Sequence, residues 1–498
     1  MGVIVRQSII TTIISYIGLV IGYLNLLYLY PLILSPEQVG LMRTVQDAAI
    51  LLAQFAQFGL AQSIIRFFPR FIGQVSHSKS FINVILLAAL VAFGFFLIVF
   101  FIFEQPILGY FQTNAREFIH YSGLVLWLSF ITVITTLMEV YSRSLLKNVL
   151  PNLLKEIVVR VLLALVVLLY FKGLLTFPQL VTSTVFIYAI CLAILVISLA
   201  IQGHLHTRVD LGVIEPALRA DIIRFSLLSF AGTAGLIIVG KVDSLMVAGL
   251  LGLAPVAVYS ISFYMATVIE IPKRAMTQVA SPLISRAFER NDREEINKIY
   301  HKTALNQFIL GTLLLIGIVA NLDSIFSLMP KGDFYEAGKW VVVIVGFGKL
   351  VDMLFGPSSE IIVYSKYYWF NIVLILILAV SLIVTNNLLI PIYGINGAAM
   401  GSALAFIIFN LAKFIFIWIK IDLQPFSFAF IKVIIIAGLA WMAHIIIPKI
   451  EFVILDIFAR SAVITIVFGV LILWLKVSPD ANELIAKGMM MIGIRKNK

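Results

Sequence analysis

The feature that most constrains this chain is its series of long apolar stretches separated by short polar segments. A bilayer core about 30 Å thick is crossed by a helix of about 20 apolar residues, and on that measure the sequence has about fourteen spans. They are predicted at residues 8–32, 41–65, 81–103, 118–142, 153–171, 178–202, 225–248, 256–279, 303–327, 338–362, 367–389, 397–419, 428–447 and 457–475. Charged residues make up only 12% of the chain. Soluble domains carry about 25%, so we expect an all-α integral membrane protein.

The segments outside these spans leave little room for anything else. The N-terminal apolar stretch is too long for a signal-peptide core, and we predict that it is the first retained helix. The polar segment 283–302 has room for a surface helix but for no soluble domain. The chain has one cysteine, Cys191, and six histidines without ligand spacing, so no metal site and no cofactor are predicted. No P-loop or nucleophile elbow is found, which favours a carrier over an enzyme.

The positive charges predict an orientation. If the N-terminus is cytoplasmic, the cytoplasmic side holds about 27 of the 36 Lys and Arg residues and the opposite side about seven, as the positive-inside rule requires. The basic tail, with Arg495, Lys496 and Lys498, then lies in the cytoplasm as well. We therefore predict an even number of spans with both termini in the cytoplasm.

The first and seventh spans carry a similar stripe of small and polar residues. At an offset of 218, Ser15 corresponds to Thr233 and Asn25 to Asp243. A duplication of six spans, followed by two extra ones, explains this pattern, and its halves would share one orientation. The predicted domains are an N-terminal six-helix bundle at 1–215, a C-terminal six-helix bundle at 216–422, and two further spans with the basic tail at 423–498.

Two meanings are open for such a stripe. Small residues allow close helix packing in lipid, but they also suit helices that face a water-filled cleft between the two halves. The second span favours the cleft, because Arg43, Asp47, Gln54 and Gln57 fall on one face of a helix. Large amides pack poorly in hydrocarbon. A hydrated cavity accounts for them better.

Ionisable residues inside spans are costly and by default indicate function. Lys349 and Asp352 lie three residues apart and are expected to share a face and to pair. Glu139 and Arg143 are expected to form a structural pair. The other ionisable residues inside predicted spans include Asp47, Lys241, Asp243, Glu270 and Glu360.

A proline follows Glu270 and is expected to bend or break its helix. Such breaks occur where transporter helices line a cavity. Lys273 and Arg274, which come directly after Pro272, are equally consistent with cavity residues and with cytoplasmic anchors.

Three segments carry a family resemblance. They are 34–71, with a turn expected at Gly40 and the sequence Arg66-Phe67-Phe68 near its end; 239–275; and IPIYGINGAAMGSALAF at 390–406. In order and spacing they resemble the polysaccharide flippases of the multidrug/oligosaccharidyl-lipid/polysaccharide exporter superfamily. The likeness covers nearly the whole chain.

This resemblance implies two six-helix bundles that form a V around a cavity opening alternately to either side. It also implies transport of undecaprenyl-diphosphate-linked oligosaccharide across a bacterial inner membrane, with the lipid-linked substrate, the bilayer and other polysaccharide assembly proteins as partners. The expected diphosphate-binding cations are Lys241, Lys349 and Arg66. The expected residues for charge pairing, or for a coupling proton or sodium ion, are Asp243, Asp352, Glu270 and Asp47. The expected polar residues of the cavity are Ser15, Asn25, Gln54, Gln57 and Thr233.

Lipid II flippases resemble one another in having arginines on the cavity side of the first helices. Here the first span has no charge after Arg6. A surface polysaccharide unit, such as the O-antigen of lipopolysaccharide, is therefore favoured over a peptidoglycan precursor.

Two alternatives stay open at this point. One is an ion-coupled drug or cation antiporter of the same architecture, which would need a cavity that attracts cations. The other is a membrane polysaccharide polymerase or lipid-sugar transferase, for which the predicted outward loops are short.

Overall fold

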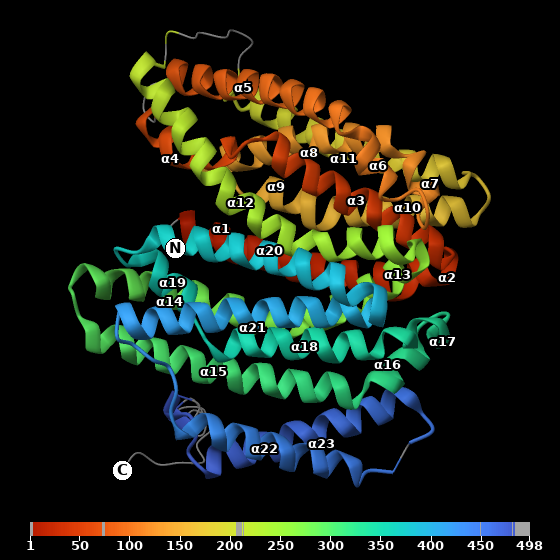
Figure 1. Cartoon of the computed structure of the whole chain (residues 1–498), viewed down its shortest axis with the longest axis vertical. Coiled ribbons are helices and arrows are strands. Elements are labelled where there is room, and N and C mark those ends of the chain that lie inside the picture. Colours follow the sequence, from red (N-terminus) through yellow and green to blue (C-terminus); the bar gives the residue numbers. More distant parts are fainter. Residues whose placement is uncertain are drawn as a thin grey trace. The chain divides into compact units, whose positions relative to one another are not determined.

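The computed structural model describes residues 3–71, 75–205, 212, 214–448, 450–480 and 482–483. Within these residues the chain consists of helices and short connections, without a β-strand (Figure 1). In this described part of the chain, eleven helices are long and apolar enough to cross a membrane, and the number is up to 13 if each of two bent pairs is one span. A helix satisfies its own backbone hydrogen bonds, which hydrocarbon requires. The all-α membrane fold is confirmed, whereas the count of fourteen spans stays a prediction.

The chain forms two compact units, Met1–Ser260 and Ile261–Lys498. The proposed division at 215 and 422, the V-shaped arrangement and the sixfold duplication stay predictions. The basic tail with Arg495, Lys496 and Lys498 lies outside the described residues.

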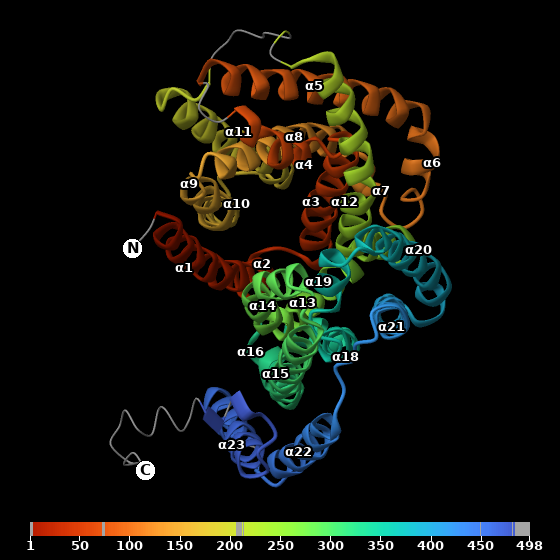
Figure 2. The same ribbon diagram turned by 90° about the vertical axis from the view of Figure 1, so that its left-hand side faces the viewer.

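The first unit is built around α3, which packs against α8 and α12 (Figures 1 and 2). Its elements are α1 (Val3–Leu24), η1 (Asn25–Leu29), α2 (Tyr30–Ile33), α3 (Pro36–Ala56), α4 (Leu60–Phe67), η2 (Phe68–Phe71), α5 (Val75–Ile102), α6 (Glu104–Gly109), α7 (Arg116–Ile119), α8 (Ser122–Ser144), α9 (Val149–Leu153), η3 (Leu154–Val158), α10 (Val159–Phe171), α11 (Phe177–Ile201), α12 (Pro216–Leu251) and most of α13 (Leu253–Thr267). Two of them, η1 and η3, are π-helical segments, a feature frequent at functional sites. The continuous helix from α9 to α10 carries Lys155, Glu156 and Arg160, and it is not among the candidate spans.

The second unit is built around α15, which packs against α14, α18, α22 and α23. Its elements after α13 are η5 (Val268–Glu270), α14 (Ile271–Glu289), α15 (Arg293–Ala320), α16 (Leu322–Leu328), α17 (Gly332–Tyr335), η6 (Glu336–Gly338), α18 (Lys339–Leu354), α19 (Ser358–Tyr364), α20 (Tyr368–Tyr393), α21 (Ile395–Lys420), α22 (Phe428–Ile445) and α23 (Val453–Trp474). The neighbouring pair α22 and α23 is seen side by side in Figure 2. Pro272 follows the 3-10 turn η5, which interrupts the α-helical pattern without ending the span Leu253–Glu289.

Two of the predicted spans, 41–65 and 338–362, correspond to the two bent pairs. α3 and α4 meet at 56°, and the helices on either side of Gly356 meet at 45°. Gly59 forms the first bend with φ of 74°, and a Cβ atom there would lie 2.3 Å from the carbonyl oxygen of Ser226. A glycine is therefore required both by the left-handed backbone and by the close approach of α12. The bend directs α4 away just after Gln54 and Gln57.

Candidate functional site

Asp47 is the centre of a charge cluster in the first unit. It lies on α3 with 2% of its side chain exposed, and Lys241 of α12 donates to Oδ1 over 2.6 Å. Arg43, one turn earlier, places Nε 3.2 Å from Oδ2. This Nε atom is buried and has no hydrogen-bond partner, so charge rather than a directional bond holds it there. Two cationic groups thus surround one carboxylate inside apolar helices, where isolated charges are costly.

The local sequence explains how α3 presents this cluster. Ser35 and Gln38 form a capping box that starts the helix, and Arg43 and Asp47 then share a face because they are four residues apart. Gly40 was expected in a turn, but it lies inside α3. A Cβ atom at Gly40 would fall 1.8 Å from the carbonyl oxygen of Leu253, so this glycine allows α13 to approach. The expectation of a turn was wrong because close helix packing selects glycine too.

Asp243, also on α12, contacts a different helix from the one that Lys241 contacts. Its Oδ2 accepts a hydrogen bond of 2.8 Å from the hydroxyl of Tyr259, on α13. Asp243 is 4% exposed. Its role in ion coupling stays a prediction.

The small and polar stripe is used largely for contacts between helices of the first unit. Asn152 donates to Ser15 over 3.2 Å, and Asn25, at the start of η1, donates to the carbonyl of Arg160 over 2.9 Å. Thr233 bonds to the carbonyl of Ser229 in its own helix. The contacts of Ser15 and Asn25 favour the packing interpretation for these two residues.

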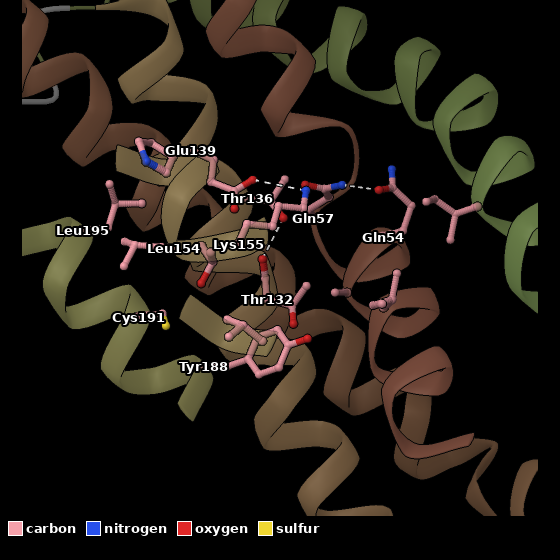
Figure 3. A pocket seen from close by; sticks show the side chains of 16 residues that line it. Gln54, Gln57, Thr132, Thr136, Glu139, Leu154, Lys155, Tyr188, Cys191 and Leu195 are labelled. Carbon is pink, nitrogen blue, oxygen red and sulfur yellow. Dashed lines mark hydrogen bonds and ion pairs between the residues drawn. The ribbon is translucent and has the colours of Figure 1, made fainter. Parts of the chain in front are cut away.

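Gln54, in the last turn of α3, and Gln57, the C-cap residue of this helix, line a cavity of about 340 Å³ within the first unit. Its walls come from α3, α8, α9 to α10, α11 and α12, as Figure 3 shows from close by. Its polar lining residues are Gln54, Gln57, Thr132, Thr135, Thr136, Glu139, Lys155 and Tyr188. Its remaining lining residues are Ile50, Ala53, Pro151, Leu154, Val159, Cys191, Leu195 and Ile237.

Two polar contacts organise the cavity wall. Gln57 donates to Gln54 Oε1 over 2.5 Å, and Lys155 lies 3.6 Å from Glu139. The expected pair of Glu139 with Arg143 is not what the structure contains. Glu139 faces η3 instead, so its closest cation comes from a neighbouring helix rather than from its own.

The second unit contains a ladder of ion pairs between two helical segments. Lys349 donates to Glu270 over 2.8 Å, and Lys273 donates to Asp352. The acid and the base on each segment are three residues apart, so both segments present their pair on one face. The predicted pair of Lys349 with Asp352 was wrong, because each finds a partner of opposite charge on the facing segment.

Lys413 of α21 completes this second cluster. Its side chain is 2% exposed, and its ammonium lies 3.9 Å from Asp352 and donates to Ser359 over 3.1 Å. It also lies 4.2 Å from the centroid of the Phe409 ring, a favourable cation–π distance. Three lysines therefore surround the two carboxylates of Glu270 and Asp352.

Sequence reasoning missed Lys413, although a lysine inside the apolar run IIFNLAKFIFIW is the signal that finds such residues. It also left Lys273 undecided and did not single out Lys155. The contact with Asp352 shows that Lys273 is a cluster residue.

Arg66 lies outside the Asp47 cluster and is not among the residues that line the cavity. It lies in the last turn of α4, is exposed, and places its guanidinium 4.3 Å from the ring centroid of Phe225. Its contacts are those of a cation on an aromatic face. Its role in diphosphate binding stays a prediction.

Comparison with known proteins gives a family and a fold. Residues 4–288, more than half of the chain, match the sequence profile of a family described as polysaccharide biosynthesis protein. The chain is similar in structure to the lipid II flippase MurJ in an inward closed conformation, with a TM-score of 0.74 and 13% identity over 92% of this chain and 98% of that one.

Two further solved structures share the fold. An inward-facing multidrug resistance MATE transporter of the MOP superfamily gives a TM-score of 0.62 and 16% identity, covering 85% of this chain and 98% of its own. The Vibrio cholerae MATE transporter VcmN, in a mutant form, gives 0.53 and 14%, covering 83% and 97%. A comparison with curated proteins finds no match.

Proposed function

Because the chain belongs to the polysaccharide biosynthesis protein family, we propose that it is an alternating-access transporter that flips undecaprenyl-diphosphate-linked oligosaccharide from the cytoplasmic to the outer leaflet. The MurJ-like fold supports this role, since MurJ is a flippase of lipid II. The physical problem is the same for any such cargo. A diphosphate and a glycan are strongly hydrated, and hydrocarbon offers them no hydrogen bonds. Charged and polar groups inside the protein replace part of that hydration.

The observation that carries the proposal is an excess of cations in each charge cluster. Arg43 and Lys241 share the single carboxylate of Asp47. In the second unit, three lysines and Arg274 share the carboxylates of Glu270, Asp352 and Glu360, which leaves one cation in excess. A cluster with one uncompensated cation attracts an anionic diphosphate and repels a cationic drug.

The ion pairs also suggest how binding and coupling are linked. When the cargo diphosphate engages Lys241 or Lys349, the carboxylate of Asp47 or Glu270 loses part of its compensation. A proton or a sodium ion would then bind that carboxylate more readily. Transport of the cargo would then be coupled to an ion, because the diphosphate and the carboxylates compete for the same lysines.

We place the protein in the bacterial inner membrane, with both termini in the cytoplasm and the O-antigen of lipopolysaccharide as the class of product. Other polysaccharide assembly proteins would act before and after it. The flipped unit must be supplied by glycosyl transfer to a lipid phosphate and consumed by polymerisation or ligation.

An ion-coupled drug or cation antiporter is the second candidate function, favoured by the likeness to MATE transporters. Lys241 and Lys349 each contact a carboxylate, so neither presents a bare positive charge. The two functions differ instead in the net charge of each cluster. An antiporter for cations requires an excess of carboxylates there.

The test is complementation of a flippase-deficient strain by Lys241→Met with Lys349→Met. We expect surface glycan to fall at least about tenfold to a hundredfold, because the loss of even one charge-assisted hydrogen bond costs about 1.5–3 kcal/mol. Asp47 keeps Arg43, and Glu270 keeps Arg274 at 3.6 Å, so neither carboxylate is stranded.

Immunoblots of the membrane fraction must show normal amounts of this variant. Lys339→Met, which removes a half-buried lysine paired with the exposed Asp323, is the matched control and should export normally. Full complementation by the double variant would refute binding of the diphosphate by these lysines.

A further inference from the structure

The cavity of the first unit contains polar atoms that no protein group satisfies. The side-chain oxygens Oε1 of Gln57 and Oγ1 of Thr135 are buried and have no hydrogen-bond partner among the described residues. Gln57 as a residue is 4% exposed. Reversing the assignment of its amide nitrogen and oxygen would still leave one of the two atoms unpaired. Buried polar atoms in native proteins are nearly always satisfied, so these point to an occupant of the cavity.

The charge of the cavity excludes the diphosphate as that occupant. Glu139 and Lys155 are its charged lining residues, and they lie 3.6 Å apart and compensate each other. The cationic residues Arg43 and Lys241 do not line it. A neutral polar ligand fits this balance better than an anion does.

The cavity has polar groups on one side and apolar groups on the other. Amides and hydroxyls from α3 and α8 face apolar groups from η3 and α11, including Leu154 and Leu195, and Tyr188 adds an aromatic ring (Figure 3). A sugar ring has the same division, with hydroxyl groups at its edge and C–H groups on its faces. Small-molecule pockets span about 300–1,000 Å³. A cavity of about 340 Å³ lies at the small end of this range, a size that suits one or two sugar rings.

We propose that this cavity is a subsite for the glycan, in which Gln54, Gln57 and the threonines of α8 read the hydroxyl or acetamido groups of one or two neutral sugar rings. The inference rests on the proposed function, because it assumes a glycan as cargo. In this proposal, the cavity inside the first unit determines which sugar is bound. The charge cluster at Asp47 is a separate site.

The chain carries a native reporter for this cavity. Cys191, its single cysteine, is among the lining residues. In purified full-length protein, the rate of N-ethylmaleimide reaction with Cys191 measures access to the cavity, and Cys191→Ser gives the background. The probes are lipid-linked oligosaccharides extracted from the cells that make them, and undecaprenyl diphosphate without sugar.

We expect the glycosylated lipid, at about ten times its Kd, to slow the reaction about tenfold by mass action, and the lipid without sugar to leave it unchanged. Gln57→Leu should raise the concentration needed for protection about threefold to tenfold, as the loss of one or two hydrogen bonds implies. Gln112→Leu, a change on an exposed segment, is the matched control and should protect as the wild type does.

Results that would contradict the glycan subsite differ from results that would contradict the proposed function. Equal protection by undecaprenyl diphosphate, or no protection although the glycosylated lipid still raises the melting temperature, would overturn the glycan subsite and leave the proposed function intact. A Cys191 thiol that does not react in the free protein would also overturn the subsite. Failure of the glycosylated lipid to bind at all would overturn the proposed function itself.

Discussion

Asp352→Ala is expected to lower the free energy of unfolding by about 3–5 kcal/mol, because removing one partner of a buried ion pair leaves uncompensated charge. Asp352 lies 3.9 Å from the ammonium of Lys413 and accepts a hydrogen bond from Lys273. Lys413 is 1% exposed, so its ammonium is shielded from water. Without Asp352, two ammonium groups are left to repel each other inside the second unit.

The measurement is the melting temperature in detergent, followed by the fraction of protein that stays monodisperse after heating. Asp323→Ala is the matched control, because its carboxylate is 67% exposed and such pairs contribute at most about 1 kcal/mol. Adding Lys273→Met and Lys413→Met to Asp352→Ala should restore most of the stability, since apolar groups of similar size replace buried ion pairs well. A wild-type melting temperature for Asp352→Ala alone would show that the lysines are not buried as described.

Arg43→Glu is expected to lower glycan export at least about a hundredfold, because a like charge placed beside an anionic ligand costs several kcal/mol. The change converts the Asp47 cluster from one excess cation to one excess anion. It spares the hydrogen bond of Lys241 to Asp47 and replaces a residue that is 27% exposed, so folding is affected less than binding. The measurement is surface glycan in the complemented strain, normalised to the amount of protein in the membrane.

Two variants calibrate this result. Arg43→Gln removes the charge without reversing it, and we expect export between those of the wild type and Arg43→Glu. Arg116→Glu reverses an exposed charge on α7 and should leave export unchanged. Normal export by Arg43→Glu would contradict an anionic cargo at this cluster.

The sequence was sufficient to predict the membrane fold, because the length and apolarity of each span are local properties. The resemblance to the exporter superfamily is likewise confirmed by the family and fold comparisons. The partner of a charged side chain, in contrast, can be far away in the sequence. Lys241 and Asp47 are 194 positions apart and meet only because α3 packs on α12. Spacing on a single helix suggested Lys349 with Asp352, whereas the facing segment supplies the partner of each.

The internal repeat also shows that contacts cannot be predicted from local sequence alone. Ser15 and Thr233 correspond in sequence, but one accepts a bond from another helix and the other bonds within its own. Gln54 and Gln57 line a cavity within the first unit. The hydrated cleft between the two halves, in which they were expected, stays a prediction.

Translocation in proteoliposomes tests the anionic cargo most directly. Wild-type protein and Lys241→Met with Lys349→Met are reconstituted, and the transfer of lipid-linked oligosaccharide between leaflets is measured alongside uptake of an organic cation such as ethidium. We expect the wild type to transfer the glycolipid at least about ten times faster than the double variant, as the loss of charge-assisted hydrogen bonds requires, and to leave ethidium outside. Equal glycolipid transfer by the two proteins, or ethidium uptake by the wild type without glycolipid transfer, would contradict the proposed function.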